Sequence, residues 1–316
     1  MSRRLLLASV VLAGCANTSG NTNVVCTPLA TGPAHRSVDW TGTVFTIVME
    51  NKNRDDIVGN KDAPFINQLA KQNADAAGYR DPEVHPSEPN YLWMVAGENF
   101  GVLDDSDPAQ HHIASTSHIA DQIELAGLTW KTYQESMGDA CGVASHGRYA
   151  AKHDPFVYFD DINGWDGKQF QPSQRCIDHV VDYAQFDADL AAGKLPSYVF
   201  ITPNLDHDMH DGSIAAGDQW LANEVPKILG SDAFNHGGVL FLLWDEGSGS
   251  LSPGDDPPFF AISPHAKQGY VSSERYDTSS YLLTVQKMLG LQSLPCEPDA
   301  ASVHSMDDLF AVPLAR

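Results

Sequence analysis

The sequence is poor in basic residues. Its 316 residues include 19 Lys and Arg against 41 Asp and Glu, which gives a formal net charge of −22 at pH 7. Because nucleic-acid backbones are bound through Lys and Arg, this balance argues against a nucleic-acid-binding surface. It also disfavours electrostatic attachment to anionic lipid. Most of the acidic excess is expected on a solvated surface, and part of it is available to cluster around a metal ion.

Long apolar runs are scarce as well. Residues 5–12 are apolar and follow the basic Arg3-Arg4, but they are too few to span a membrane. This is the pattern of an export signal. Leu12-Ala13-Gly14-Cys15 resembles the lipobox of bacterial lipoproteins, which predicts cleavage before Cys15 and acylation of that cysteine. We therefore expect a membrane-anchored lipoprotein in the periplasm or on the cell surface, with an ordinary secretory signal and a secreted protein as the alternative.

Cysteine is rare, and the remaining cysteines include no closely spaced pair. Besides Cys15 they are Cys26, Cys141, Cys176 and Cys296. A zinc site is therefore the weaker interpretation, and in an exported chain four cysteines predict two disulfides. Among the three possible connectivities we expect Cys141–Cys176, which closes a medium loop, and Cys26–Cys296, which ties the ends of the domain together.

Three apolar runs without polar alternation dominate the pattern. Residues 43–49, 198–202 and 239–244 are predicted to be strands buried on both faces of a parallel sheet. Segments with helical spacing separate them, and the resulting alternation predicts one doubly wound α/β domain. The predicted helices cover 64–73, 119–126, 186–192, 218–229 and 279–289, with a helix opening at 92–96 and a further strand at 128–133. We divide the chain into a signal peptide (1–14), a tether (15–40) and a single domain (41–316).

Polar residues follow each of the three buried runs. Glu50-Asn51 comes after the first, Asp245-Glu246 after the third, and residues 204–212, with three Asp and two His, after the second. Ligands of open α/β sheets bind beyond the carboxyl ends of the strands, so we expect one shared polar site. Adjacent carboxylates repel one another unless a cation lies between them, and oxygen ligands suit Mg²⁺, Ca²⁺ or Mn²⁺, although Zn²⁺ also accepts them. The alternative is that both carboxylate pairs are solvated and only begin loops.

Ser87 lies between two prolines in residues 85–91. The prolines restrict the backbone on both sides, so the hydroxyl is expected on a rigid turn. Serine becomes a useful nucleophile when a base or a metal ion lowers its effective pKa. A purely structural proline turn is the alternative.

Five motifs occur in order over about residues 43–291. They are Val48-Met-Glu-Asn51, residues 85–91, Lys152-His-Asp-Pro-Phe-Val-Tyr158, residues 202–205 with 208–211, and Trp244-Asp-Glu-Gly247. Together they resemble a bacterial phosphoesterase family, which includes acid phosphatases and phospholipases C, within the alkaline-phosphatase-like superfamily. The resemblance implies an α/β/α sandwich around a mostly parallel sheet. It also implies a metal-dependent hydrolase that passes through a covalent phospho-enzyme.

The resemblance also implies a role for each matching residue. The family pattern puts Ser87 in the position of the nucleophile, with a histidine protonating the leaving group. The substrate it implies is a small phosphorylated molecule, and no protein partner is implied. The implied roles are catalysis by Ser87, His153 and His210, substrate binding by Asn90, Asp208 and His85, and binding of a divalent metal ion (Ca, Mg, Mn or Zn) by Glu50, Asn51, Asp245 and Glu246.

Three departures from the family pattern bear on rate and substrate preference. Asp255-Asp256-Pro257 stands where relatives often have Arg, Thr278 stands where many have His, and a cysteine pair is missing near Ser106 and His111. With no added domain after Arg316, we expect an acid phosphatase acting on soluble phosphomonoesters. A phospholipase C-type phosphodiesterase is the first alternative. A non-catalytic lipoprotein that binds metal or phosphate is the second.

Overall fold

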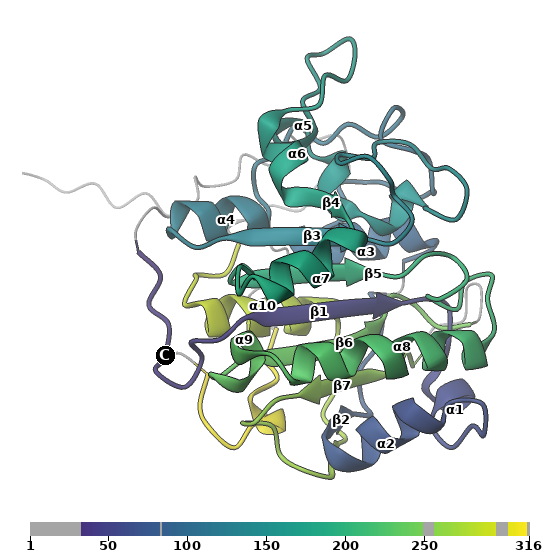
Figure 1. Ribbon diagram of the computed structural model, residues 1–316, viewed down its shortest axis with the longest axis vertical. Coiled ribbons are helices and arrows are strands. Elements are labelled where there is room, and N and C mark those ends of the chain that lie inside the picture. Colours follow the sequence, from purple (N-terminus) through teal and green to yellow (C-terminus); the bar gives the residue numbers. More distant parts are fainter. Residues whose placement is uncertain (1–32, 83, 249–255, 295–302, 315–316) are drawn as a thin grey trace, which may run out of the picture.

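The computed structural model describes residues 33–82, 84–248, 256–294 and 303–314, and its centre is one eight-stranded sheet (Figure 1). The strand order is β4-β3-β5-β1-β6-β7-β2-β8. The strands are β1 Val44–Met49, β2 Ala74–Ala76, β3 Trp130–Gln134, β4 Val180–Asp182, β5 Tyr198–Thr202, β6 Val239–Trp244, β7 Phe259–Ile262 and β8 Tyr270–Ser272.

The central strand β1 explains why its sequence lacks polar alternation. It runs parallel to both neighbours, with Val44 opposite Tyr198 of β5 and Val239 of β6. Val44 and Val48 pack into one hydrophobic core with α3 and α10, whereas Phe45, Ile47 and Met49 pack into a second core with α2 and α8. A strand covered on both faces is mostly apolar, as predicted for a parallel sheet, and the one polar residue of β1, Thr46, shares a hydrogen bond with Tyr281 at 2.7 Å.

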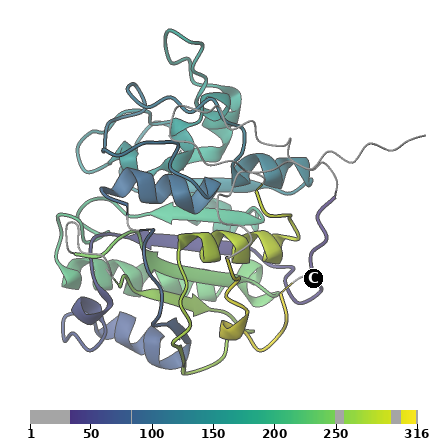
Figure 2. The same ribbon diagram turned by 180° about the vertical axis from the view of Figure 1, so that it is seen from behind.

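Helices cover both faces of the sheet. In Figure 1, α2, α7, α8 and α9 lie in front of the strands, and in Figure 2, which is seen from behind, α3, α4 and α10 lie in front of them. The predicted α/β/α sandwich is therefore confirmed. The helices are α1 Arg54–Ile57, α2 Pro64–Gln72, α3 Ser87–Ala96, α4 Ile119–Leu125, α5 Asp160–Asn163, α6 Gln174–His179, α7 Ala184–Ala191, α8 Ile214–Leu229, α9 Asp232–Asn235 and α10 Thr278–Leu289, with 3₁₀ turns at Ala151–His153, Pro155–Tyr158 and Asp307–Leu309.

Helix α3 begins earlier than the sequence predicts. The helix opening was expected at residue 92, but Ser87 is already its first residue and Pro86 is its N-cap. Pro89 fits because N–H groups in the first helical turn have no intrahelical partner, so proline loses no hydrogen bond there. The rigid turn expected around Ser87 is thus the start of a ten-residue helix.

The apolar run at 257–263 contains β7, which pairs antiparallel with β6 and with β2. The sheet is therefore mixed, with its parallel part centred on β1. The three-residue strands β2, β4 and β8 are too short to show a period in the sequence.

The predicted disulfide Cys141–Cys176 is present, with an S–S distance of 2.01 Å and a Cα–Cα distance of 5.3 Å. It ties the long connection after β3 to helix α6 and spans 35 residues of sequence. Cys15, Cys26, Cys296 and the predicted signal peptide lie outside the described residues.

Replacing both Cys141 and Cys176 by alanine is expected to lower the free energy of unfolding by about 3–4 kcal/mol, because the closed loop restricts the unfolded chain. Urea unfolding of the double variant measures the loss, with reduced wild type as the control. An unchanged midpoint in the variant would contradict the expectation.

The end of the predicted tether packs on the domain. Trp40 is buried and its indole N–H donates to the carbonyl of Pro313 at 3.0 Å, while the amide of Ala34 donates to the carbonyl of Ala126 at 3.2 Å. These contacts extend the packed domain to residues before 41. None of the helices in the described ranges is long and apolar enough to cross a membrane.

Candidate active site

Three loops meet at the carboxyl ends of β1, β5 and β6, where the arrowhead of β1 lies in Figure 1. The amide of Glu50 donates to the carbonyl of Asp208 at 2.8 Å, and the amide of Asn51 donates to Oδ1 of Asp245 at 3.2 Å. Asn51 holds a positive φ of 54°, a conformation that Asn tolerates better than most residues. Backbone geometry thus joins the polar residues that follow the three strands.

Helix α3 brings Ser87 to the first of these carboxylates. The Ser87 hydroxyl donates to Oε2 of Glu50 at 3.1 Å. Tyr91, four residues later and so on the same helix face, donates to Oε1 of Glu50 at 2.6 Å. All three side chains are buried. Both oxygens of this carboxylate are therefore oriented by one helix.

The second carboxylate pair meets the residues that flank Ser87. Oε2 of Glu246 lies 2.6 Å from Nδ1 of His85 and accepts from the Asn90 amide at 3.0 Å. The Asn90 amide also donates to the carbonyl of Val84 at 2.8 Å. Residues 84–90 are thus bound to the end of β6, and the hydroxyl and both acidic pairs share one site.

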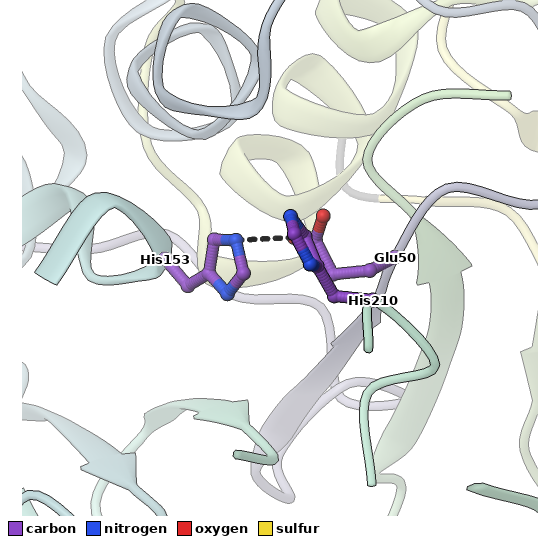
Figure 3. Close-up of side chains that lie close together, drawn as sticks. All are labelled: Glu50, His153 and His210. Carbon is purple, nitrogen blue, oxygen red and sulfur yellow. Dashed lines mark ion pairs between the residues drawn. The ribbon is translucent and has the colours of Figure 1, made fainter. Parts of the chain in front are cut away.

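Two histidines complete the site. Figure 3 shows His153 and His210 beside Glu50, with Nε2 of His153 3.2 Å from Oε1 of Glu50. Nδ1 of His153 lies 3.2 Å from Oδ2 of Asp208, and its ring stacks on Tyr91 at a centroid distance of 5.2 Å. Glu50, His153 and His210 each offer a ligand-type atom, and these atoms lie within 4.8 Å of one another. The two histidines predicted to be catalytic could therefore also bind a metal ion together with Glu50.

Burial and mutual repulsion disturb the carboxylates of the site. Burial is the main cause that raises the pKa of Asp208 and of Asp245 to about 7. Burial and the charge of Asp245 raise the pKa of Glu246 to about 9 and that of Glu50 well above its ordinary value. Burial also lowers the pKa of His153, which favours a neutral ring with a free lone pair. The site therefore carries more buried acid than its own cations balance.

This donor set fits a divalent cation. Four buried atoms have no hydrogen-bond partner among the described residues, namely Asn90 Oδ1, His153 Nε2, Asp208 Oδ2 and Asp245 Oδ2. Buried polar atoms are normally paired, and a cation would pair with the acceptors gathered here. Among the predicted ligands, Asp245 offers an oxygen, Oδ2, that has no hydrogen-bond partner among the described residues. Glu50 and Glu246 each accept hydrogen bonds from neighbouring side chains, and the bond from Asn51 to Asp245 comes from the backbone N–H, so it does not use the Asn51 side chain.

A second group of possible ligands is already balanced. His118, Asp121 and Asp161 also lie within ligand distance of one another, but Arg175 contacts both aspartates, at 2.5 and 2.6 Å. The guanidinium provides the positive charge that a metal ion would otherwise supply. We assign no metal to this group.

Some residues of the site escaped the sequence analysis. Lys152 lies 2.7 Å from Asp105 and 3.1 Å from His210, and Tyr91 holds Glu50. Lys152 stands inside a recognised motif, and helical spacing from Ser87 would have identified Tyr91 had the helix start been known. Close by, Oε1 of buried Glu88 lies 2.7 Å from Nδ1 of His111.

At two of the positions that depart from the family pattern, the residue present forms an ion pair or a hydrogen bond. Asp256 pairs with Arg80 at 2.8 Å, and Thr278, the first residue of α10, shares a hydrogen bond with Tyr79 at 3.1 Å. Asp255 lies outside the described residues.

Comparisons with known proteins identify first the fold and then the family. A phosphonate monoester hydrolase from Silicibacter pomeroyi has the same fold, with a TM-score of 0.57. The two proteins are 11% identical, and the match covers 85% of this chain and 76% of that one. For an alkaline phosphatase superfamily protein from Vibrio parahaemolyticus the score is 0.54 (12% identity, 92% and 76%). The chain belongs to the phosphoesterase family, whose model matches residues 48–292. It is accordingly an enzyme that hydrolyses phosphoester bonds.

Individual relatives agree with this assignment. A phosphatidylinositol-3-phosphatase of Mycobacterium tuberculosis is 34% identical over 250 residues, which cover 78% of this chain and 77% of that protein. A phosphate-repressible acid phosphatase of Penicillium chrysogenum is 29% identical over 66% of this chain and 50% of its own. A probable acid phosphatase of Kluyveromyces lactis is 29% identical over 64% and 47%. The chain spans about half the length of these two fungal relatives.

Proposed function

We propose that the protein is an exported, metal-dependent acid phosphatase that hydrolyses phosphomonoesters through a phosphoserine at Ser87. The observation that carries the proposal is the 3.1 Å contact between the Ser87 hydroxyl and Glu50, inside a cluster of buried carboxylates. The names of the relatives support it, because acid phosphatases and a phosphatidylinositol-3-phosphatase both remove phosphate from monoesters.

The residues divide the reaction between them. Glu50 accepts a hydrogen bond from the Ser87 hydroxyl and is placed to receive its proton. The Ser87 oxygen then forms a bond to phosphorus while the bond from phosphorus to the leaving oxygen breaks. Glu50, Asn51, Asp245 and Glu246 would hold a divalent cation, which would supply positive charge near the serine and phosphoryl oxygens. His153, between Glu50 and Asp208, is placed to take up the proton that Glu50 receives and to pass a proton to the leaving oxygen.

The second half of the reaction frees the serine. Water attacks phosphorus and gives a proton to His153, the bond from phosphorus to the Ser87 oxygen breaks, and that oxygen recovers a proton from Glu50. Tyr91 and His85 act by position, because they fix the orientations of Glu50 and Glu246. We assign His210 to the rim of the site, where it contacts Lys152 and Asp211.

A panel of substrates and metal ions tests the proposal. Chelated protein is expected to be inactive, and add-back of Mg²⁺, Ca²⁺, Mn²⁺ or Zn²⁺ one at a time should restore hydrolysis of p-nitrophenyl phosphate. Faster release from p-nitrophenyl phosphorylcholine would instead support a phospholipase C-type diesterase. No turnover with any ion would support a non-catalytic binding protein. A phosphoinositide monoester in mixed micelles tests whether a lipid can replace the soluble substrate.

Export and anchoring are proposed from the sequence alone. We expect that Cys15→Ser moves the protein from the membrane fraction to the soluble fraction of the host, because the acylated side chain is lost. Cys26→Ser is the matched control and should stay with the membrane. A wild-type protein found in the soluble fraction would favour the ordinary secretory signal.

A further inference from the structure

Lys152 is a cation placed against the acidic site. Its ammonium lies 2.7 Å from Oδ2 of Asp105 and 3.1 Å from Nε2 of His210, and its side chain is 15% exposed. Its positive charge opposes the rise in pKa of every carboxylate in the cluster. The four carboxylates are Glu50, Asp208, Asp245 and Glu246. Lys152 therefore shares one electrostatic environment with them, although it forms an ion pair with none of the four.

The contact with His210 defines how the ammonium is held. A lysine ammonium only donates, so Nε2 of His210 must accept and its hydrogen must be on Nδ1, which lies 2.8 Å from Oδ1 of Asp211. Asp105 and His210 thus engage two of the three N–H donors of Lys152. Asp105 is fixed in turn by the amide of Glu88, which donates to its other oxygen at 3.0 Å.

A chain of contacts leads from the nucleophile to this lysine. Ser87 contacts Glu50 at 3.1 Å, and Glu50 lies 3.2 Å from His153. The His153 and His210 ring centroids are 5.6 Å apart, and His210 contacts Lys152. Ser87 and Lys152 stand at the two ends of this series. The nucleophile and the lysine therefore belong to one continuous group of neighbouring side chains.

The charge of the substrate decides what such a lysine can do. A phosphomonoester carries a charge of about −1.5 to −2 at neutral pH on three non-bridging oxygens. In a diester one of these oxygens bears a second organic group, and a single negative charge remains. The buried carboxylates repel the monoester more strongly, so a monoester gains more from a nearby fixed cation.

We propose that Lys152 binds a non-bridging oxygen of the substrate phosphoryl group and thereby gives the site its preference for phosphomonoesters over phosphodiesters. The inference rests on the proposed phosphatase function and adds the residue that selects the substrate class. The remaining N–H of the ammonium is the donor assigned to the substrate. Asp105 and His210 hold it in place, which limits the side-chain entropy lost on binding.

Substrates that share a leaving group isolate this effect. We expect Lys152→Gln to lower kcat/KM for p-nitrophenyl phosphate by about 10- to 100-fold, the range of a lost charge-assisted hydrogen bond. For bis(p-nitrophenyl) phosphate the loss should stay within about 3-fold, because that substrate lacks the third anionic oxygen. Lys152→Arg keeps the charge and should retain most of the monoester activity.

A matched control comes from a second lysine–aspartate pair. Lys131 lies 2.8 Å from Asp189, its side chain is 22% exposed, and it is near the amino end of β3, away from the site. Lys131→Gln removes the same charge from a similar ion pair and should leave the ratio of monoester to diester activity unchanged. Thermal unfolding of each variant confirms that the compared proteins are folded.

Binding of inorganic phosphate supplies a readout that needs no turnover. Calorimetric titration of the metal-loaded protein should show affinity for phosphate reduced about 10-fold or more in Lys152→Gln and unchanged in Lys131→Gln. Equal losses on both substrates, or unchanged phosphate affinity, would overturn the proposal and leave Lys152 as a counter-ion of the carboxylates. A larger loss on monoesters with poor leaving groups would overturn it in favour of a role at the leaving oxygen. If wild type hydrolysed neither ester, the phosphatase proposal would fail, and the titration would still decide the role of Lys152.

Discussion

Replacement of Ser87 by alanine is expected to reduce phosphomonoester hydrolysis by at least about a thousandfold, because the atom that attacks phosphorus is gone. The remaining carboxylates, histidines and metal ion could still bind phosphate. Steady-state hydrolysis of p-nitrophenyl phosphate measures the loss, and phosphate titration shows that the site still binds. Undiminished turnover would remove Ser87 from the mechanism.

The fold of this variant should persist. The Ser87 side chain is small and donates a hydrogen bond to Glu50, so its removal costs about 1 kcal/mol. Ser272→Ala is the matched control, because Ser272 is a buried serine that also donates to a carboxylate, at 2.5 Å to Asp308. It lies on β8, outside the site, and the control variant should keep full activity.

The metal-free protein is expected to lose stability as the pH rises from about 4 to about 7. The pKa of Asp208 and of Asp245 is about 7 in the folded chain, against about 4 for an ordinary Asp. Between these values the folded state holds protons that the unfolded state releases, so the free energy of unfolding falls with rising pH. Glu246, with a folded pKa of about 9, continues the fall above pH 7.

A bound cation should reverse this dependence. It takes the place of the protons between the carboxylates, so metal add-back stabilises the protein more at pH 8 than at pH 5. Thermal unfolding at both pH values, with chelator and with added ion, measures the difference. Greater stability of the chelated protein at pH 8 than at pH 5 would contradict the account.

Asp245→Asn separates two effects of the buried carboxylate, which are the destabilisation of the metal-free protein and the binding of the metal ion. In chelator at pH 8 the variant should unfold at a higher temperature than wild type, because a repelled carboxylate is gone, and added metal should stabilise it less. Asp189→Asn is the control, and its expected effect on stability has the opposite sign. Burial alone would raise the pKa of Asp189, but hydrogen bonds from Lys131 and Tyr133 outweigh it and lower the pKa, so this variant should be less stable at pH 8.

The sequence predicts the centre of this molecule well for a physical reason. β1, β5 and β6 are buried on both faces, so their sequences are mostly apolar without polar alternation, and parallel strands bring their carboxyl ends to one edge. Glu50 and Asp245 could therefore be expected to meet. The roles of the individual ligands and of the nucleophile remain predictions that the experiments above test.

Other features depend on contacts that no local pattern records. The antiparallel direction of β7 is not recorded in its own apolar sequence, and β2 and β8 have three residues each. The helix start at Ser87 is obscured by its flanking prolines, and with it the reach of Tyr91 to Glu50. Lys152 is placed by two residues distant in sequence, Asp105 and His210, so its position could be seen only in the folded chain.

The central claim is that phosphate passes through Ser87. The direct measurement is to mix metal-loaded protein with p-nitrophenyl phosphate, quench it in acid during the first turnovers, and map the phosphorylated peptide by mass spectrometry. The account predicts one phosphoryl group, on Ser87. A phosphoryl group on a different residue, or none in a protein that releases p-nitrophenol in a burst, would contradict it.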